Sequence, residues 1–293
     1  GQISIEEMKN VYNIELIYEK TQLIGVIGAF AENSMSKYMH NACFKAKGAN
    51  FVYMPLKVAE GELKEFMNNF RKFQFKGASV TIPHKIEIMD FTDVIDDTAK
   101  KIGAVNVLNN ENGKITGYNS DCYGAMEALK GKTPLKNKKV LVIGAGGAAR
   151  AIIYGLKQEN SLITVVNRTI DNAQSLANEF GIECKEMEKI RELIRNNEII
   201  INTTSIGMSP KPDESVISEK DMVGGKIVMD IVYKPIETKL IRIAKKAKCT
   251  AITGDRMLAY QAVMPFKIWT KREAGFNLME NALLEQIRKG KGE

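Results

Sequence analysis

Residues 140–150 read VLVIGAGGAAR and decide the fold of the second half of the chain. Four apolar residues predict a buried strand, and a glycine-rich stretch follows it directly. A helix is predicted as far as Lys157, and a second strand at Leu162–Val166. This order is typical of a dinucleotide-binding fold, in which Gly144 permits the tight turn and Gly146 lets the backbone approach a pyrophosphate. The alternative is a glycine-rich turn that only lets a helix pack close to a strand.

Strand-like and helix-like stretches alternate through the rest of the chain, which predicts an α/β protein. Further strands are expected at residues 23–28, 51–56, 77–82, 199–201, 227–230 and 250–252, and helices at 36–46 and 59–73. The second series predicts a Rossmann-type, doubly wound domain, and the first an N-terminal α/β domain. The amphipathic stretch from 257 to 289 is expected to form C-terminal helices that pack back on the first domain.

A length of 293 residues is enough for about two domains. We expect an N-terminal extension or linker at 1–20, a substrate or catalytic domain at 21–130 plus 257–293, and a nucleotide-binding domain at 131–256. The boundary is placed at the Gly131-Lys132-Thr133-Pro134 stretch.

Composition excludes several classes of protein. Apolar residues make up 44% of the chain and charged residues 26%, which excludes disorder, and the net charge of +7 falls short of a nucleic-acid-binding signature. Neither a long apolar run nor a basic-then-apolar leader occurs, so a cytoplasmic protein is expected. Four widely spaced cysteines and two histidines, His40 and His84, give no metal-binding pattern, and the cysteines are expected to be reduced.

The end of the strand 162–166 indicates which nicotinamide cofactor is bound. An NAD site usually has Asp or Glu there, whereas this chain has Asn167, Arg168 and Thr169. A guanidinium and a hydroxyl suit a 2′-phosphate, so NADP is favoured, with Arg150 as a second candidate cation. The alternative for Arg168 is a solvated surface cation.

A lysine and a carboxylate in the first half form a candidate acid–base pair. Lys85 follows the strand 77–82, and Asp121 follows Gly117-Tyr118-Asn119-Ser120. An ammonium can protonate the alkoxide formed when hydride adds to a ketone, and a nearby carboxylate can orient it. The alternative is a surface ion pair. His84 is expected to be structural.

Seven ordered segments together resemble the motifs of the shikimate dehydrogenase family. These segments are 77–85 (GASVTIPHK), 102–106 (IGAVN), 117–121 (GYNSD), 144–148 (GAGGA), 167–169 (NRT), 202–208 (NTTSIGM) and 261–262 (QA). The resemblance implies an oxidoreductase that reversibly reduces 3-dehydroshikimate to shikimate with NADPH, in chorismate and aromatic amino acid biosynthesis. It also implies a cleft between the two domains that closes around the substrate.

The resemblance carries residue roles with it. Lys85 and Asp121 match the catalytic pair. The substrate-binding positions match Ser34, Ser36, Thr81, Asn106, Tyr233 and Gln261. The cofactor-binding positions match Gly144, Ala145, Gly146, Gly147, Ala148, Asn167, Arg168, Thr169, Thr203, Ser205, Gly254 and Met257. No metal is implied, and the partners are the small-molecule substrate and NADP(H), not nucleic acid or a membrane.

Three features qualify the resemblance. The serine loop has Lys37 where the family usually has proline, which removes a fixed φ and adds a cation near the expected carboxylate site. Cys122 follows Asp121 where the family usually has glycine. The segments Gly1-Gln2-Ile3-Ser4 and Tyr12-Asn13-Ile14 are similar to the junction of fused enzymes in which a 3-dehydroquinate dehydratase precedes the dehydrogenase, so a fused or neighbouring dehydratase is expected.

Three alternative functions remain open from the sequence. One is a quinate/shikimate dehydrogenase that uses NAD, which Asn167-Arg168-Thr169 disfavours. Another is a non-catalytic NADP-binding regulator, which the intact Lys85 and Asp121 disfavour. A nucleic-acid-binding protein would show strongly salt-dependent binding.

Overall fold

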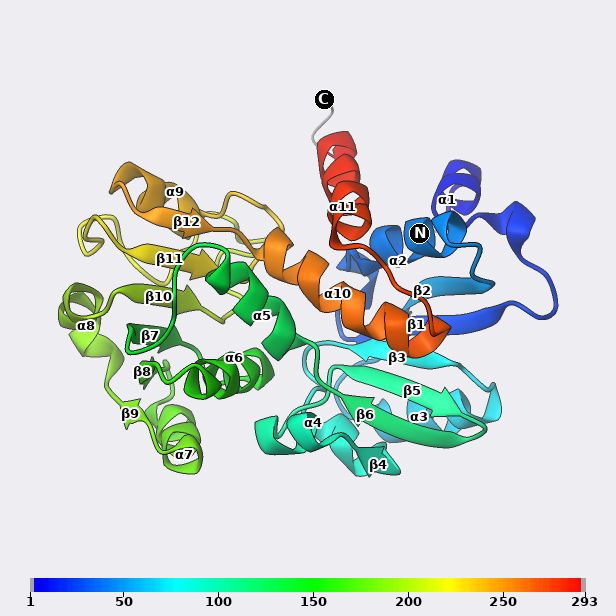
Figure 1. Ribbon diagram of the computed structural model, residues 1–293, viewed down its shortest axis with the longest axis horizontal. Coiled ribbons are helices and arrows are strands. Elements are labelled where there is room, and N and C mark those ends of the chain that lie inside the picture. The colour runs from blue at the N-terminus through cyan, green and yellow to red at the C-terminus, as the bar shows by residue number, and fades with distance from the viewer. Residues whose placement is uncertain (1–2, 291–293) are drawn as a thin grey trace. The chain divides into compact units, whose positions relative to one another are not determined.

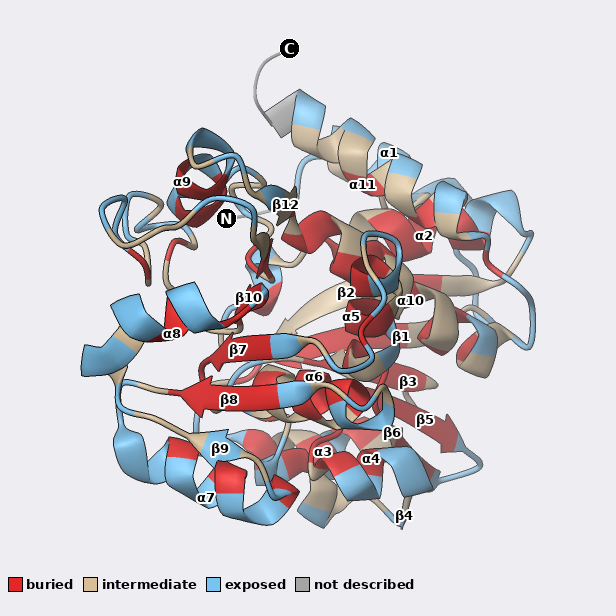
Figure 2. Cartoon of the chain, turned by 60° about the vertical axis from the view of Figure 1, so that its left-hand side comes forward, coloured by how far each residue is buried: buried red, intermediate tan, exposed pale blue. Residues whose placement is uncertain are grey.

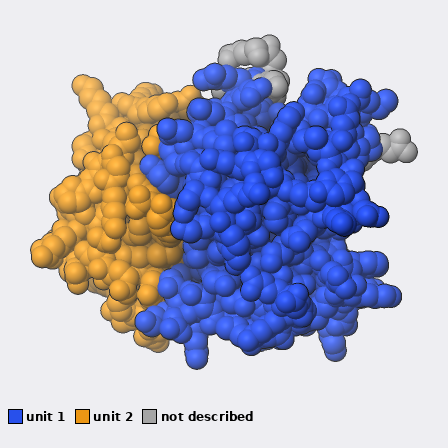
Figure 3. All heavy atoms as spheres, turned by 45° about the vertical axis from the view of Figure 1, so that its right-hand side comes forward, with its two compact units in different colours: residues 1–120, 259–293 blue, residues 121–258 orange. Residues whose placement is uncertain are grey.

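The computed structural model describes residues 3–290 and side chains as far as Arg288, so Gly1 and Gln2 of the expected fusion junction lie outside the described residues. Two compact units divide the chain: unit 1 is residues 1–120 and 259–293, and unit 2 is residues 121–258 (Figures 1 and 3). Each unit contains a six-stranded sheet. The α/β prediction is confirmed. No described helix is long and apolar enough to cross a membrane.

Unit 2 is built on a fully parallel sheet. Its strands are β7 (Lys139–Ile143), β8 (Leu162–Val166), β9 (Glu183–Cys184), β10 (Ile199–Asn202), β11 (Ile227–Asp230) and β12 (Thr250–Ile252). In the order β12-β11-β10-β7-β8-β9 the first strand of the unit is central. The chain adds strands on one side of β7 as far as β9 and then continues on the other side with β10, so the strand order reverses between β7 and β10. This is the doubly wound order of Rossmann folds, in which ligands bind at the crevice where the order reverses.

The helices of unit 2 follow from apolar stripes in the sequence. They are α5 (Asp121–Lys130), α6 (Gly147–Gln158), α7 (Ile170–Phe180), α8 (Ile190–Asn196), α9 (Lys239–Lys246) and the start of α10 (Gly254–Thr270), with a 3-10 turn, η4 (Met187–Lys189). The strands β7, β8 and β10 are buried along nearly their whole length (Figure 2). Strands covered on both faces read as continuous apolar runs, which is why the sequence predicted them well.

Unit 1 has a mixed sheet. Its strands are β1 (Gln22–Gly28), β2 (Phe51–Lys57), β3 (Gly77–Val80), β4 (Val94–Ile95), β5 (Val107–Glu111) and β6 (Lys114–Tyr118), in the order β2-β1-β3-β5-β6-β4. β1, β2 and β3 are parallel, while β5 is antiparallel to both β3 and β6. The carboxyl ends of β1 and β3 and the amino end of β5 therefore lie at one edge of the sheet.

The helices of unit 1 come from both ends of the chain. They are α1 (Ile5–Asn10), α2 (Ser36–Ala46), α3 (Leu63–Lys72), α4 (Asp97–Ile102), the later part of α10 and α11 (Phe276–Gly290), with 3-10 turns η1 (Ile14–Leu16), η2 (Ala31–Asn33) and η3 (Glu87–Phe91). Residues 3–20, expected as an extension or linker, thus contain a helix and a turn.

The C-terminal helices pack on unit 1, as expected from their amphipathic pattern. The indole nitrogen of Trp269 donates to the carbonyl oxygen of Leu108 at 2.9 Å, and the thiol of Cys43 lies 3.3 Å from the sulfur of Met279. A break at residues 271–275 turns the predicted tail into two helices. All four cysteines are free thiols.

Candidate active site

The glycine loop of unit 2 lies at the carboxyl ends of the two strands where the sheet order reverses. Gly144 has φ +116°, and a Cβ there would lie 2.4 Å from the hydroxyl oxygen of Thr203, so only glycine fits. Its N–H donates to Val166. Thr203 follows β10 and donates both its N–H and its hydroxyl to the carbonyl of Ile143, at 2.9 and 2.8 Å. The loop is therefore fixed against both neighbouring strand ends.

The residues after the turn have the features that a dinucleotide pyrophosphate requires. Gly146 is the N-cap of α6, and among the described residues no side chain caps this helix. A Cβ on Gly146 would meet nothing within 4 Å, so the backbone is open on that side. The loop and first turn comprise Gly144, Ala145, Gly146, Gly147 and Ala148. Open amides at a helix N-terminus attract phosphate, so these residues fit the cofactor.

The two candidate arginines, Arg168 after β8 and Arg150 on α6, have different surroundings. The Asn167 side chain donates to the carbonyl of Thr169 at 3.0 Å and so closes the loop after β8. Arg168 is exposed, and no ion pair to it is found within the described part of the chain. Arg150, by contrast, pairs with Glu179 and lies over a phenyl ring. Arg168 is thus the better placed to take an anionic group.

A buried polar network that the sequence analysis did not single out supports the loop after β10. Asp230 accepts from the side-chain amide of Asn202 at 2.9 Å and from the Thr238 hydroxyl at 2.6 Å. Asn202 in turn accepts from the N–H and hydroxyl of Thr204. Burial raises the pKa of Asp230 to about 6, although these hydrogen bonds oppose the shift. Asp230 at the end of the apolar strand β11 was the sequence signal from which this network could have been predicted.

Four other proposed positions of unit 2 lie on the loops and helix that follow its strands. Ser205 is exposed beyond β10, and Tyr233 is half-buried three residues beyond β11. Gly254 begins α10 so close to the carbonyl of Ile231 that a Cβ would lie 2.4 Å from it. Met257 is buried one turn later. Contact of Ser205, Gly254 and Met257 with the cofactor stays a prediction, as does contact of Tyr233 with the substrate.

In unit 1 four of the proposed substrate positions adjoin strands at the edge where β1 and β3 end: Ser34 and Ser36 follow β1, Thr81 follows β3 and Asn106 precedes β5. Gly28 leaves no room for a Cβ, which would lie 2.4 Å from the Thr81 methyl group. Thr81 donates its N–H to Ile27. Beyond Gly28 the chain runs through η2 to Ser34, whose hydroxyl accepts from the N–H of Ser36 at 3.2 Å.

Lys85 is held at the same edge by its backbone. Its carbonyl accepts from the N–H of Val105 at 2.7 Å, and the next residue, Asn106, accepts from Val80 at the end of β3. His84 is fully buried, and its Nε2 donates to the Val58 carbonyl at 2.9 Å. The structural role expected for His84 therefore agrees with its contacts.

The side chain of Asn106 links this edge to the segment that carries Asp121. Its carbonyl oxygen accepts from the N–H of Ser120 at 2.7 Å, and its amide donates to the Ser120 hydroxyl at 3.1 Å. Asp121 follows directly, is 1% exposed, and is the first residue of α5. A helix N-terminus favours a negative charge. Lys85 and Ser120, the residue before Asp121, are thus each anchored to the Val105–Asn106 pair.

Two further side chains of unit 1 bear on a polar substrate. The Oε1 atom of Gln261 on α10 is buried, with no hydrogen-bond partner in the described structure. A buried acceptor without a donor is costly, so it suits a ligand hydroxyl. Lys37, expected as a cation at the carboxylate site, instead places its ammonium 2.6 Å from Glu7.

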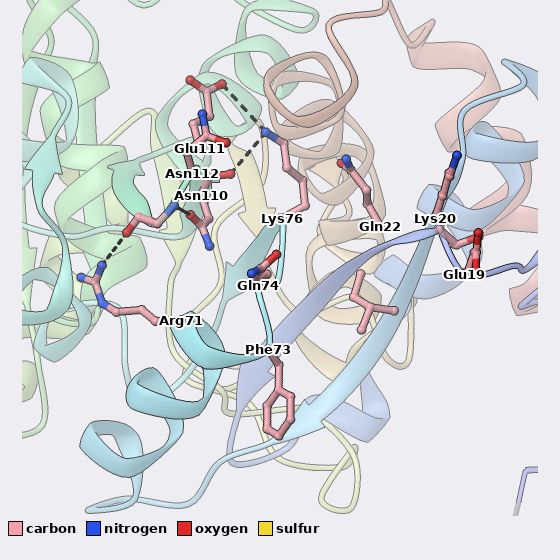
Figure 4. A pocket seen from close by; sticks show the side chains of 13 residues that line it. Glu19, Lys20, Gln22, Arg71, Phe73, Gln74, Lys76, Asn110, Glu111 and Asn112 are labelled. Carbon is pink, nitrogen blue, oxygen red and sulfur yellow. Dashed lines mark hydrogen bonds and ion pairs between the residues drawn. The ribbon is translucent and has the colours of Figure 1, made fainter.

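A hollow of about 910 Å³ lies at the opposite edge of the same sheet, where β1 and β3 begin (Figure 4). Its polar groups pair with one another: Lys76 with Glu111 and the carbonyl of Asn110, and Arg71 with the carbonyl of Gly113. None of the proposed site residues lines it.

Comparison with known proteins identifies the family. The model of the shikimate dehydrogenase substrate binding domain matches residues 26–108, and that of shikimate/quinate 5-dehydrogenase matches residues 127–233. The chain belongs to the shikimate dehydrogenase family. Both matches together cover more than half of it.

Full-length members of the shikimate dehydrogenase family are similar throughout. The NADP(+) enzyme of Methanococcus maripaludis is 42% identical over 93% of this chain and 100% of its own. A crystal structure of a shikimate dehydrogenase in complex with NADP+ has a TM-score of 0.86 at 40% identity, over 92% of this chain and 97% of its own. The Thermus thermophilus enzyme in complex with NADP(H) and shikimate has a TM-score of 0.82 at 32% identity, over 90% and 99%.

Proposed function

We propose that this chain is an NADP-dependent oxidoreductase that reversibly reduces 3-dehydroshikimate to shikimate, a step of chorismate biosynthesis. The observation that carries the proposal is the full-length similarity to enzymes named shikimate dehydrogenase (NADP(+)). The open glycine loop of unit 2 and the polar edge of unit 1 support it independently. A cytoplasmic location and a fused or neighbouring dehydratase stay predictions of the sequence.

Unit 2 supplies the residues that would hold NADP(H). The open amides of Gly147 and Ala148 and the space beside Gly146 suit the pyrophosphate. Asn167, Arg168 and Thr169 suit the adenosine ribose with its 2′-phosphate. When bound, NADPH supplies the hydride that adds to the substrate ketone.

The chemistry assigned to this chain's own residues is proton transfer and charge stabilisation. Lys85 stabilises the negative charge that develops on the ketone oxygen and donates a proton to it. Asp121 orients the Lys85 ammonium. In the reverse direction the neutral Lys85 amine takes the proton of the shikimate hydroxyl as hydride leaves, and Asp121 relays that same proton onward. Atoms and charge balance, because one proton and one hydride reduce one carbonyl to an alcohol.

The remaining polar residues are assigned to the substrate carboxylate and hydroxyls. Ser34, Ser36 and Thr81 offer hydroxyl donors, and the buried Gln261 Oε1 offers an acceptor. The side-chain amide of Asn106 can both donate and accept, and its bond to Ser120 holds it in place. Tyr233 adds a phenol from unit 2. This donor and acceptor set suits a polyhydroxy acid.

Turnover tests the proposal directly. Purified protein is mixed with NADPH and 3-dehydroshikimate while NADPH absorbance is followed, beside reactions with NADH and reverse reactions with shikimate and quinate. Fast NADPH-selective reduction with poor oxidation of quinate is expected. NADPH binding without turnover would overturn the proposal in favour of a non-catalytic NADP-binding protein, and preferential oxidation of quinate would change the substrate.

A further inference from the structure

The start of α2, which positions Ser34 and Ser36, is poorly specified by its own sequence. Its N-cap residue, Met35, makes no side-chain capping bond, and the first turn contains no acidic residue. It contains Lys37 instead, although a helix N-terminus favours negative charge. The one local side-chain bond to a backbone N–H of this turn found in the described structure is the one that the Ser34 hydroxyl accepts from Ser36.

A carboxylate from another segment compensates for these defects. Glu7 on α1 approaches the Lys37 ammonium to 2.6 Å, and α1 lies beside α2 (Figure 1). The Lys37 side chain is only 11% exposed, so solvent screens the pair weakly. Burial disfavours the charged ammonium, but the partners around it outweigh this, and the pKa of Lys37 is raised.

Two aromatic rings complete the surroundings of this ammonium. It lies 5.0 Å from the ring centre of Tyr38 and 5.9 Å from that of Tyr12, distances at which a cation is attracted to an aromatic face. Tyr12 is 8% exposed and anchors the segment that follows α1. Lys37 is thus enclosed by groups that favour its charge and hold it away from solvent.

The helix α1 contributes little burial of its own. None of its residues is buried, and Ile5 is 75% exposed. Ser4 caps the helix: its hydroxyl accepts from the N–H of Glu7 at 3.0 Å, and this bond fixes the position of the Glu7 backbone. In a capping box that carboxylate would bond back to the residue-4 N–H, whereas here it bonds Lys37. The main contribution of α1 to unit 1 is therefore the charge of Glu7.

We propose that Glu7 and Lys37 are positioning residues for substrate binding, and that the N-terminal segment 4–12 holds the Ser34–Ser36 loop in its binding conformation. This contact between residues 30 apart orders the second residue of α2, the position at which the family usually has proline. The inference rests on the proposed function, because it takes Ser34 and Ser36 as substrate-binding residues.

The test compares Glu7→Gln, Lys37→Gln and Lys37→Arg with wild type. Glu7→Gln and Lys37→Gln are each expected to raise KM for 3-dehydroshikimate and Kd for shikimate about three- to tenfold. Neither kcat nor the Kd for NADPH should change by more than about twofold, because neither residue touches the reacting atoms. Lys37→Arg keeps the positive charge, so its KM for 3-dehydroshikimate should be close to that of wild type.

A matched control separates loop positioning from loss of any ion pair. Glu198→Gln breaks the 2.7 Å pair with Lys138 in unit 2 and should leave KM unchanged. Unchanged KM and Kd for the substrate in Glu7→Gln, or an equal rise in KM in Glu198→Gln, would overturn the inference. Failure of the proposed function looks different, because then the wild-type protein itself does not reduce 3-dehydroshikimate.

Discussion

The two units differ in the kind of binding groups that they present. Unit 2 uses backbone: a positive-φ glycine, the open amides of α6 and strand ends fixed by Thr203. Unit 1 uses side chains, with Lys85 and Asn106 at a sheet edge and Gln261 on α10. A backbone site is sensitive to any added Cβ, whereas a side-chain site is sensitive to the loss of single functional groups. The substitutions that inactivate each unit should therefore differ in kind.

The largest expected difference between the units concerns pH. Burial lowers the pKa of His40 in unit 1 from 6.5 to about 3 and raises that of Asp230 in unit 2 from 3.8 to about 6. The stability contributed by neutral His40 is complete above pH 6.5 and is lost as pH falls towards 3. The stability contributed by neutral Asp230 is complete below pH 3.8 and is lost as pH rises through 6. Each group changes the free energy of unfolding by roughly 3 kcal/mol across two pH units between its two pKa values.

Hydrogen exchange resolved by unit measures this contrast in His40→Phe and Asp230→Asn. The phenyl ring can keep the stacking that His40 makes on Tyr53, with ring centres 4.6 Å apart. We expect His40→Phe to flatten the acid-side loss of protection in unit 1 only, and Asp230→Asn to flatten the opposite slope in unit 2 only. Slopes of the same sign in the two wild-type units would contradict the assignment.

Loss of the Lys85 amine should have the next largest effect. Lys85→Ala is expected to lower kcat for 3-dehydroshikimate reduction by about 10²-fold or more, with a lesser effect on KM, because a positioned acid is lost. Steady-state kinetics measures it, and Lys64→Ala on the exposed face of α3 is the control. Near-normal kcat would remove Lys85 from the chemistry.

Arg168 should affect cofactor choice more than turnover. Arg168→Ala removes a charge-assisted contact worth roughly 1.5–3 kcal/mol, so the preference for NADPH over NADH should fall by about one to two decades. The ratio of kcat/KM for the two cofactors measures the change, with Arg191→Ala, an exposed arginine paired with Asp221, as control. An unchanged ratio would place the 2′-phosphate elsewhere.

The smallest of these effects tests the backbone character of unit 2. Gly146→Ala has an allowed backbone conformation and meets no described atom, so the thermal unfolding temperature should be unchanged. The added methyl group occupies the space assigned to the pyrophosphate and should weaken NADPH binding about tenfold. Fluorescence titration measures the affinity. Wild-type affinity would show that the cofactor does not approach this backbone.

Much of unit 2 could be predicted from sequence because its signals are local. The strands β8, β11 and β12 have the bounds that the sequence predicted, and the glycine loop directly follows β7. Two parts of this unit depended on residues distant in the chain. Glu179 neutralises Arg150, and Asn202, Asp230 and Thr238 join in one network only once β10 and β11 are paired.

Unit 1 was harder to predict, because its site depends on how strands are ordered rather than on any one run. The reversal at β5 and β6 brings the amino end of β5, with Asn106, beside the end of β3. The Asn112–Gly113 turn between β5 and β6 is typical of a hairpin, but the sequence analysis did not use it to predict these strands. The contact of Lys37 with Glu7 joins residues 30 apart, and Glu7 lies in the segment expected to be an extension or linker.

A crossed measurement on wild type, Lys85→Ala, Arg168→Ala and the double variant tests the division of labour most directly. NADPH affinity and the rate of 3-dehydroshikimate reduction at saturating NADPH are measured on each protein. We predict that Lys85→Ala changes only the rate, Arg168→Ala changes only the affinity, and the double variant shows both changes in full. A loss of NADPH affinity in Lys85→Ala as large as that in Arg168→Ala would contradict the account.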